Sequence, residues 1–315
     1  MVMVMSFSKE TKKELSMTEA EGNKALHAFA YGMVLFSKIF SSGQISFTTE
    51  CKSAADKYSQ VISSLTSVIV DTRSTLTRRR GEQSVFNLSV PDSSDCAKVF
   101  DYFGHTDKSP TLRINRANIE NDEDISCFLR GAFLVCGNVT DPEKDYHLEF
   151  VVPHMNLAND LARIISEIEV MPCQPNIVKR KGSYIVYIKG GDSIADMLAY
   201  MGAPMASLEI IQQKIYRSVR NKANRQRNSD VANSNKTAAA AAKQLAAIRT
   251  IRELKGLDHL TDELKELALL REEHPEYNLR ELGEELSDPI SRSGVNHRLT
   301  RIMEIAEELS SNAGL

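Results

Sequence analysis

The sequence predicts an α+β fold: a duplicated N-terminal domain with mixed αββαββα halves, followed by an all-α helix-turn-helix domain. Three observations predict it. Residues 76–104 and 176–202 carry the same features in the same order; residues 184–188 alternate in polarity as a strand does; and residues 157–168 repeat apolar side chains at helical spacing. The chain therefore combines helices and strands in two related halves.

The repeat runs through a basic triplet, a glycine turn, an alternating strand, Asp-Ser, an amphipathic helix and a final glycine. Upstream of it, Gly32 in FAYGMVLFSKIF corresponds to Gly131 in FLRGAFLVCGNV. Glycine lets two helix backbones approach closely, so we expect the opening helices of the halves to pack at these positions. We place the halves at about 8–105 and 106–205, inside a domain covering 1–212.

Bulk composition limits the classes of function. The net charge of −3 gives no global attraction to nucleic acid, so such a role depends on local basic clusters. The five cysteines form no C-x-x-C pair, and the seven histidines form no paired zinc motif. We expect reduced thiols, no bound metal and no cofactor. We also expect no membrane span and no signal peptide, hence a cytoplasmic protein.

The duplicated pattern resembles the LAGLIDADG homing endonucleases, in which two signature helices pair at the centre and two sheets form a saddle on DNA. In that family each signature helix ends in an acid that binds a catalytic divalent cation. Here the lost metal-ligand positions are Ser37 and Cys136. A hydroxyl and a thiol are poor ligands for a hard cation, so we expect no nuclease activity. Two alternatives stay open: a residual metal-dependent nuclease using Asp141, and a scaffold that binds a protein or a small ligand in the saddle.

Basic residues occur at both predicted hairpin tips of the duplicated domain, where they could contact phosphates on either side of a duplex. Solvated turn charges are the alternative. These residues are Arg78, Arg79 and Arg80 in the first half and Lys179, Arg180 and Lys181 in the second.

Residues 213–255 are expected to form a basic helical connector, interrupted near residues 229–234. From Lys214 to Lys236 there are seven basic residues and the single acid Asp230. Amide and guanidinium groups suit phosphate and base-edge contacts, which favours DNA over a merely solvated linker. The candidate contacts are Arg217, Arg220, Asn221, Asn224, Arg225 and Asn228.

Residues 256–315 read as a module of short helices. Thr261 and Asn278 are suited to cap the first two, and Ser287-Asp288-Pro289 breaks the chain before a last helix that begins at Ser291. Two helices joined by a tight turn, with a supporting helix before them, predict a helix-turn-helix. The last helix buries Val295 and Leu299 on one side.

The exposed side of that last helix carries polar and basic residues near its N-terminus and no acid, although the module is otherwise acidic. A recognition helix in the major groove needs hydrogen-bond donors for base edges and must not repel phosphate. Packing of this helix end against a neighbouring domain is the alternative. The predicted recognition residues are Ser291, Arg292, Ser293, Asn296, His297, Arg298 and Arg301.

Taken together, the LAGLIDADG-like halves, the connector RNKANRQRNSDVANSNK and the terminal ELGEELSDPISRSGVNHRLTRIMEIA resemble the WhiA family of bacterial transcription regulators. The resemblance implies a sequence-specific DNA-binding regulator linked to cell division, chromosome segregation and, in spore formers, sporulation. It implies double-stranded DNA as the partner. Because the acidic module gives weak non-specific affinity, we expect tight binding to need both domains, or a partner such as RNA polymerase, a sigma factor or another regulator.

Overall fold

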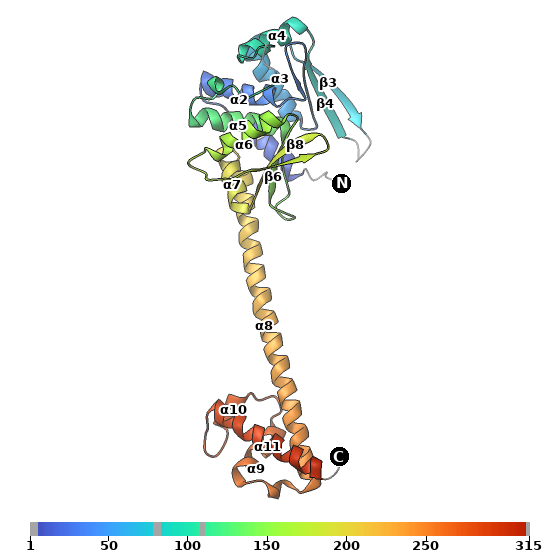
Figure 1. Cartoon of the computed structure of the whole chain (residues 1–315), viewed down its shortest axis with the longest axis vertical. Helices are drawn as coiled ribbons and strands as arrows, with labels where there is room; N and C mark the ends of the chain where they lie inside the picture. Colours follow the sequence, from blue (N-terminus) through green and yellow to red (C-terminus); the bar gives the residue numbers. More distant parts are fainter. Residues whose placement is uncertain (1–5, 78–82, 108–110, 313–315) are drawn as a thin grey trace. The chain divides into compact units, whose positions relative to one another are not determined.

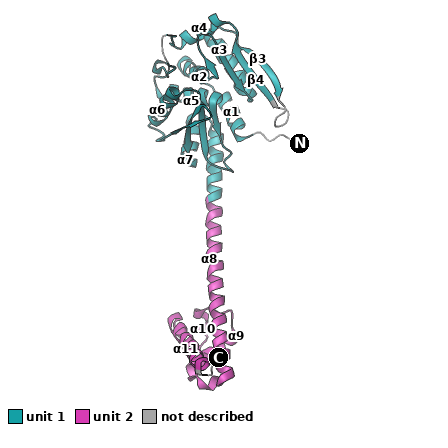
Figure 2. Cartoon of the chain, turned by 45° about the vertical axis from the view of Figure 1, so that its right-hand side comes forward, with its two compact units in different colours: residues 1–217 teal, residues 218–315 magenta. Residues whose placement is uncertain are grey.

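The computed structural model describes residues 6–77, 83–107 and 111–312, and the chain divides into two compact units, Met1–Arg217 and Ser218–Leu315 (Figure 2). No helix in the described ranges is both long enough and apolar enough to cross a membrane.

The first unit begins with α1 (Phe7–Met17), after which the same order of helices and strands occurs once in each half (Figure 1). The first half contains α2 (Asn23–Leu35), β1 (Ile39–Phe40), β2 (Ile45–Thr49), α3 (Lys52–Thr66), β3 (Asp71–Thr77), β4 (Gln83–Val90) and α4 (Ser93–Tyr102). The second contains α5 (Asp122–Cys136), β5 (Gly137–Val139), β6 (His147–Val152), α6 (Met155–Ser166), β7 (Asn176–Arg180), β8 (Ser183–Lys189) and α7 (Gly191–Tyr200). The predicted αββαββα halves are confirmed.

Each half folds its strands into an antiparallel four-stranded sheet, in the orders β1-β2-β4-β3 and β5-β6-β8-β7. The pleat explains which face is buried: in β2, Ile45 and Phe47 are buried while Thr48 is exposed, and in β6, Leu148 and Phe150 are buried. Phe47 lies opposite Leu88 and Phe150 opposite Val186, so both sheets turn an apolar face toward the helices.

The centre of this unit is the contact between α2 and α5, which lie side by side (Figure 1). A Cβ added to Gly32 would lie 2.1 Å from the carbonyl oxygen of Phe128, and one added to Gly131 would lie 2.1 Å from that of Phe29. Both obstacles are backbone atoms, which cannot move aside as a side chain can. The predicted close approach of the two helices at these glycines is confirmed, and it joins both halves in one hydrophobic core.

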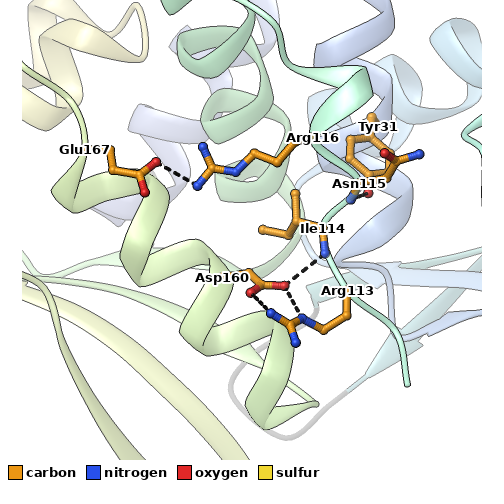
Figure 3. A network of polar contacts seen from close by, with 7 residues as sticks. All are labelled: Tyr31, Arg113, Ile114, Asn115, Arg116, Asp160 and Glu167. Atoms are coloured by element: carbon orange, nitrogen blue, oxygen red, sulfur yellow. Dashed lines mark hydrogen bonds and ion pairs between the residues drawn. The ribbon is translucent and has the colours of Figure 1, made fainter. Parts of the chain in front are cut away.

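The segment between the halves is fixed to both of them (Figure 3). Asp160 of α6 accepts hydrogen bonds from Nε and Nη2 of Arg113, each at 2.6 Å, and from the backbone N–H of Ile114 at 3.2 Å. On the other side, the backbone N–H of Asn115 donates to the hydroxyl of Tyr31 on α2 at 2.7 Å. Neither anchor was predicted, because their spacing in sequence gives no sign of the contact.

The second unit takes most of its core from four helices: the end of α8 (Pro204–Leu254), α9 (Asp262–Glu273), α10 (Leu279–Glu284) and α11 (Arg292–Asn312); η2 (Leu257–His259) joins α8 to α9. Ile248 and Ile251 at the end of α8 are fully buried with Leu267, Leu282 and Leu299. We expected the terminal module from residue 256, and its core also includes these two residues of the predicted connector.

Helix α8 is continuous over 51 residues, so the interruption expected near residues 229–234 is wrong. No glycine or proline interrupts its interior. It also contains a run of alanines, and alanine has the highest helix propensity of any residue type. The connection between α10 and α11, residues 285–291, is also longer than the tight turn that we expected. The capping prediction at Asn278 is confirmed by a capping box with Glu281, whereas the Thr261 side chain makes no cap hydrogen bond.

We expect Gly32→Ala to destabilise the first unit by about 3 kcal/mol, because the new methyl group overlaps a backbone carbonyl of the facing helix. Urea unfolding followed by circular dichroism measures the change. Gly43→Ala is the matched control, since a Cβ there meets nothing within 4 Å. Equal stability of the two variants would contradict the close helix approach.

We expect Asp160→Asn to lower the free energy of unfolding by roughly 1 to 2 kcal/mol at pH 7. Burial alone would raise the pKa of Asp160, but hydrogen bonds from Arg113 and Ile114 outweigh it and hold that pKa below its ordinary value. The stabilisation is therefore complete above the ordinary carboxyl pKa and disappears as the pH falls through the lowered one. Urea titrations at pH 7 and near pH 3 measure this difference.

Glu167→Gln is the control for that experiment, because its pairing with Arg116 at 2.7 Å joins two half-exposed side chains and contributes little. A loss for Asp160→Asn that stays constant down to pH 3 would show that the carboxylate charge is not responsible.

Candidate nucleic-acid interface

The two positions that correspond to metal ligands, Ser37 and Cys136, carry neutral side chains. Ser37 is buried; its hydroxyl donates to the carbonyl oxygen of Met33 at 2.9 Å and is 3.1 Å from the hydroxyl of Tyr58. At the end of α5, loss of hydration raises the pKa of the Cys136 thiol to about 12, against an opposing effect of Lys12. The thiol is therefore protonated at neutral pH, and neither group offers the charged oxygen that a hard cation prefers.

A lysine of α1 lies beside the second of these positions. Burial lowers the pKa of Lys12, while the thiols of Cys136 and Cys51 act on it in the opposite direction. Its ammonium nitrogen lies 6.0 Å from the ring centroid of Phe133 on α5. Within the described part of the chain, no three His, Cys, Asp or Glu side chains are grouped so that they could hold a metal ion. The geometry at this centre does not fit the cation site of a nuclease.

Asp141, the candidate for a residual metal site, lies in the turn between β5 and β6. Its carboxylate accepts from the backbone N–H of Glu143 at 2.9 Å and pairs with Lys144 at 3.6 Å. These contacts are local, and among the described residues Asp141 belongs to no group of three His, Cys, Asp or Glu side chains that could hold a metal ion.

The hairpin between β7 and β8 presents the predicted basic triplet at its tip. Lys179, Arg180 and Lys181 are all exposed, and Lys181 and Gly182 both have positive φ, as a two-residue hairpin turn requires. The ammonium group of Lys179 lies 5.8 Å from the ring centroid of Tyr184. The corresponding Arg78, Arg79 and Arg80 lie outside the described residues.

The connector residues lie on α8, as predicted. Arg217 belongs to the first unit, where its guanidinium lies 4.8 Å from the ring centroid of Tyr146 and is half-buried. The remaining candidates belong to the second unit and are fully accessible: Arg220, Asn221, Asn224, Arg225 and Asn228. Arg217 is thus held against the first unit, and the other five form an exposed polar surface.

Helix α11 presents the predicted polar face at its N-terminal end. Ser291 precedes the helix, and its hydroxyl accepts from the backbone N–H of Gly294 at 3.2 Å. Val295 and Leu299 are buried below, so the helix is held with one side free. The free side carries Arg292, Ser293, Asn296 and His297, all exposed.

Two further predicted recognition residues are engaged with acids of their own unit. Arg298 is only 21% exposed and pairs with Glu263 of α9 at 2.8 Å. Arg301 pairs with Glu304 at 2.9 Å and lies 3.7 Å from Glu308. Arg298 therefore ties α11 to α9, and Arg292 in the first turn of α11 is a cation without such a partner in the described structure.

The sequence reading missed a glycine that sets how closely α10 and α11 pack. A Cβ on Gly283 would lie 2.4 Å from the carbonyl oxygen of Ile290 and 3.0 Å from Cγ2 of Val295. The backbone N–H of Ile290 also donates to the carbonyl oxygen of Gly283 at 3.0 Å. Gly294, singled out from the sequence, has only ordinary contacts with the Ile290 side chain. The sequence signal that could have identified Gly283 is the presence of a glycine within the apolar pattern of α10.

Both parts of the chain match known protein domains. Residues 223–306 match the WhiA C-terminal HTH domain, and residues 125–220 match the WhiA LAGLIDADG-like domain. The probable cell division protein WhiA of Thermoanaerobacter pseudethanolicus is 35% identical over 97% of this chain and 98% of its own length. That of Alkaliphilus metalliredigens is 33% identical over 96% and 98%.

A solved structure shows the same fold over the whole chain. The full-length DUF199/WhiA from Thermatoga maritima is similar with a TM-score of 0.58 at 24% identity, covering 96% of this chain and 99% of that one.

We expect Gly283→Ala to destabilise the second unit by about 1 to 3 kcal/mol, since the methyl group meets a backbone oxygen in the α10–α11 connection. Thermal unfolding of the full chain measures it. Gly294→Ala is the matched control within the same unit: it should leave stability unchanged or raise it by up to about 1 kcal/mol, because alanine favours a helix. The opposite ranking of the two variants would contradict the packing described for α10 and α11.

Proposed function

The chain belongs to the WhiA family, and from that membership and the exposed polar end of α11 we propose that it is a sequence-specific DNA-binding transcription regulator acting in cell division and chromosome segregation. In this proposal, double-stranded DNA is the ligand and the protein is associated with the nucleoid. The observation that carries it is the exposed side of α11, which concentrates donors within the otherwise acidic residues 256–315.

The chemistry of that surface suits the major groove. Arginine can donate two hydrogen bonds to guanine, and asparagine can both donate to and accept from adenine. Arg292 and Asn296 occupy successive turns of α11, so both side chains can face the same groove. Ser293 and His297 extend the same surface, while Arg298 and Arg301 require release from their acidic partners before they contact DNA. The central base contacts therefore belong to Arg292 and Asn296.

Phosphate contacts are proposed for α8 and for the hairpin tips of the first unit. The exposed Arg220 and Arg225 of α8 have no ion-pair partner in the described part of the chain, and Asn221, Asn224 and Asn228 add neutral donors. Lys179, Arg180 and Lys181 offer a second basic surface. Two weak sites joined in one chain bind more tightly than either alone, which offsets the acidic character of residues 256–315.

The duplicated unit acts without nuclease chemistry in this proposal. Ser37 and Cys136 supply no carboxylate, and Lys12 stands beside Cys136. A two-metal or one-metal displacement of a phosphodiester needs oxygen ligands at these positions. The fold remains as a support for binding.

We also propose that the first unit contacts a protein of the transcription machinery: RNA polymerase, a sigma factor or another regulator. The support is an apolar stripe at the start of α8, where Leu208, Ile211 and Ile215 are exposed at helical spacing. Beside it, α1 and α8 line a groove of about 710 Å³ with the acids Glu10, Glu14 and Glu209 at its rim. Such a surface fits a partner with apolar and basic residues.

The proposal is tested with promoter fragments recovered by genome-wide crosslinking of the protein to its DNA sites. We expect Arg292→Ala and Asn296→Ala each to weaken binding to the preferred fragment by about 1 to 3 kcal/mol and to relax base preference at one position. Fluorescence anisotropy at fixed salt measures the affinity. Arg249→Ala is the control, because it removes an exposed cation of the same unit outside the predicted contacts.

Unchanged affinity and base preference in both α11 variants would overturn the recognition surface. Magnesium-dependent cutting of the same DNA by the full chain, lost in Asp141→Asn, would instead support the nuclease alternative. A chain that shifts no DNA fragment at moderate salt would act only as a protein scaffold.

A further inference from the structure

A cavity of about 500 Å³ lies inside the second unit, among α8, α9, α10 and α11. It is next to the proposed recognition surface, since Arg292 and Asn296 of α11 belong to its lining. Its volume lies in the range of small-molecule sites and exceeds that of one phosphate group. The chemically active lining residues are Lys236 and Gln244 of α8, Arg271 of α9, Arg280 of α10, and Arg292 and Asn296 of α11.

Arg271 is a buried cation without a carboxylate partner in the described structure. It is 1% exposed, and only Nη1 has hydrogen-bond acceptors, the carbonyl oxygens of His274, Pro275 and Tyr277 at 3.4, 3.3 and 2.7 Å. Its Nε is buried and has no acceptor. A buried donor on a charged group is costly to leave unpaired, so this nitrogen calls for an acceptor.

Arg130 shows that a buried arginine without a carboxylate need not have an unpaired nitrogen. It is 6% exposed, and its Nε donates to Met201 at 2.8 Å. Its Nη1 donates to the carbonyl oxygens of Thr18 and Glu19, and its Nη2 contacts Sγ of Cys127. Arg130 is a satisfied structural residue. Arg271 differs from it in two respects: its Nε has no acceptor among the described residues, and the residue belongs to the lining of a cavity.

Gln244 is the second buried polar group of this cavity without a partner. It is 5% exposed, and its Oε1 accepts no hydrogen bond from the residues that the structure describes. A glutamine amide offers a donor and an acceptor, which exchange places when the terminal torsion turns by half a circle. Arg271 and Gln244 together can therefore bind an oxygen atom, or an oxygen atom and a hydroxyl, of a ligand.

The charge of the lining selects an anion. Four of its residues are basic and none is acidic: Lys236, Arg271, Arg280 and Arg292. Arg280 is neutralised by Glu284 at 2.8 Å, whereas Lys236 and Arg292 have no ion pair within the described residues. Cations from separate helices that converge on one partly enclosed space attract an oxyanion more strongly than the same cations spread over a surface.

We propose that this cavity is a binding site for a phosphate-type oxyanion, held by Arg271 and Gln244 at the bottom and by Lys236 and Arg292 at the mouth. The phosphate comes from one of two sources, the DNA backbone beside the bases that α11 reads or a free phosphorylated small molecule. The DNA source rests on the proposed function. The small-molecule source is independent of it and would couple a metabolite to the recognition helix through Arg292.

The test uses the full chain and a substitution that places a negative charge in the cavity. Gln244→Glu adds a carboxylate to a lining that holds four basic residues and no acid, so we expect a higher melting temperature without ligand and no further response to phosphate. Gln60→Glu is the matched control, the same change at an exposed position of the first unit. Lys236→Gln is a second, exposed variant that keeps the fold while it weakens the mouth of the site.

In the first arm, inorganic phosphate is added against chloride at equal ionic strength and thermal unfolding is followed. For the small-molecule source, we expect phosphate to raise the melting temperature of the wild type and of Gln60→Glu by about 4 °C or more. Gln244→Glu should not respond, and Lys236→Gln should need more phosphate.

In the second arm, preferred promoter DNA is bound at several salt concentrations. For the DNA source, we expect Lys236→Gln to reduce the slope of log affinity against log salt by about one. Gln244→Glu should weaken binding at least tenfold. One neutral methylphosphonate in the DNA backbone should weaken the wild type and leave Gln244→Glu unaffected.

A response in either arm that Gln244→Glu abolishes supports the site and identifies its source. If Gln244→Glu behaves as Gln60→Glu does in both arms, the proposal is overturned. Phosphate stabilisation of a chain that binds no promoter DNA would remove the proposed function and leave the cavity site standing.

Discussion

The contact between α2 and α5 is the constraint on which the first unit depends. Gly32 and Gly131 bring backbone against backbone, and a single methyl group at either position would meet a carbonyl oxygen at 2.1 Å. Each sheet packs against helices of its own half, so the distance between the two central helices sets how the halves share one core. The segment between the halves is then held by Tyr31 on one side and Asp160 on the other.

This packing does not require the chemistry of a nuclease. At the two helix ends, the Ser37 hydroxyl donates to a carbonyl oxygen and lies near a tyrosine hydroxyl, and Cys136 packs against the hydrophobic core with Lys12 nearby. Because the glycines lie a full turn or more before these ends, the acids can be absent while the helices still pack. Fold and catalysis are separable here, and the fold alone does not decide the function.

In the second unit, the polar groups of α11 and its surroundings divide into three kinds. Arg298 is engaged with Glu263 and ties α11 to α9, whereas Arg301 is engaged with Glu304 of its own helix. Arg292 and Asn296 are exposed at the N-terminal turns of α11. Arg271 and Gln244 are buried below with unpaired atoms. The proposed recognition surface and the proposed oxyanion site therefore share the first turns of one helix.

The sequence by itself determined the duplication, the strands and helices of both halves, the glycine contact, the positions without metal ligands and the polar end of α11. Each of these is a repeat, a period or the absence of one residue type, and all are readable along the chain. Only the tertiary structure decided that α8 is unbroken and that Gly283 limits the approach of α10 to α11. It also decided that Arg298 and Arg301 pair with acids, whereas Arg271 is buried without an acidic partner among the described residues. The physical reason is that pairing, burial and close approach depend on residues far apart in the chain, and helical periodicity fixes which face a side chain occupies without fixing what lies opposite it.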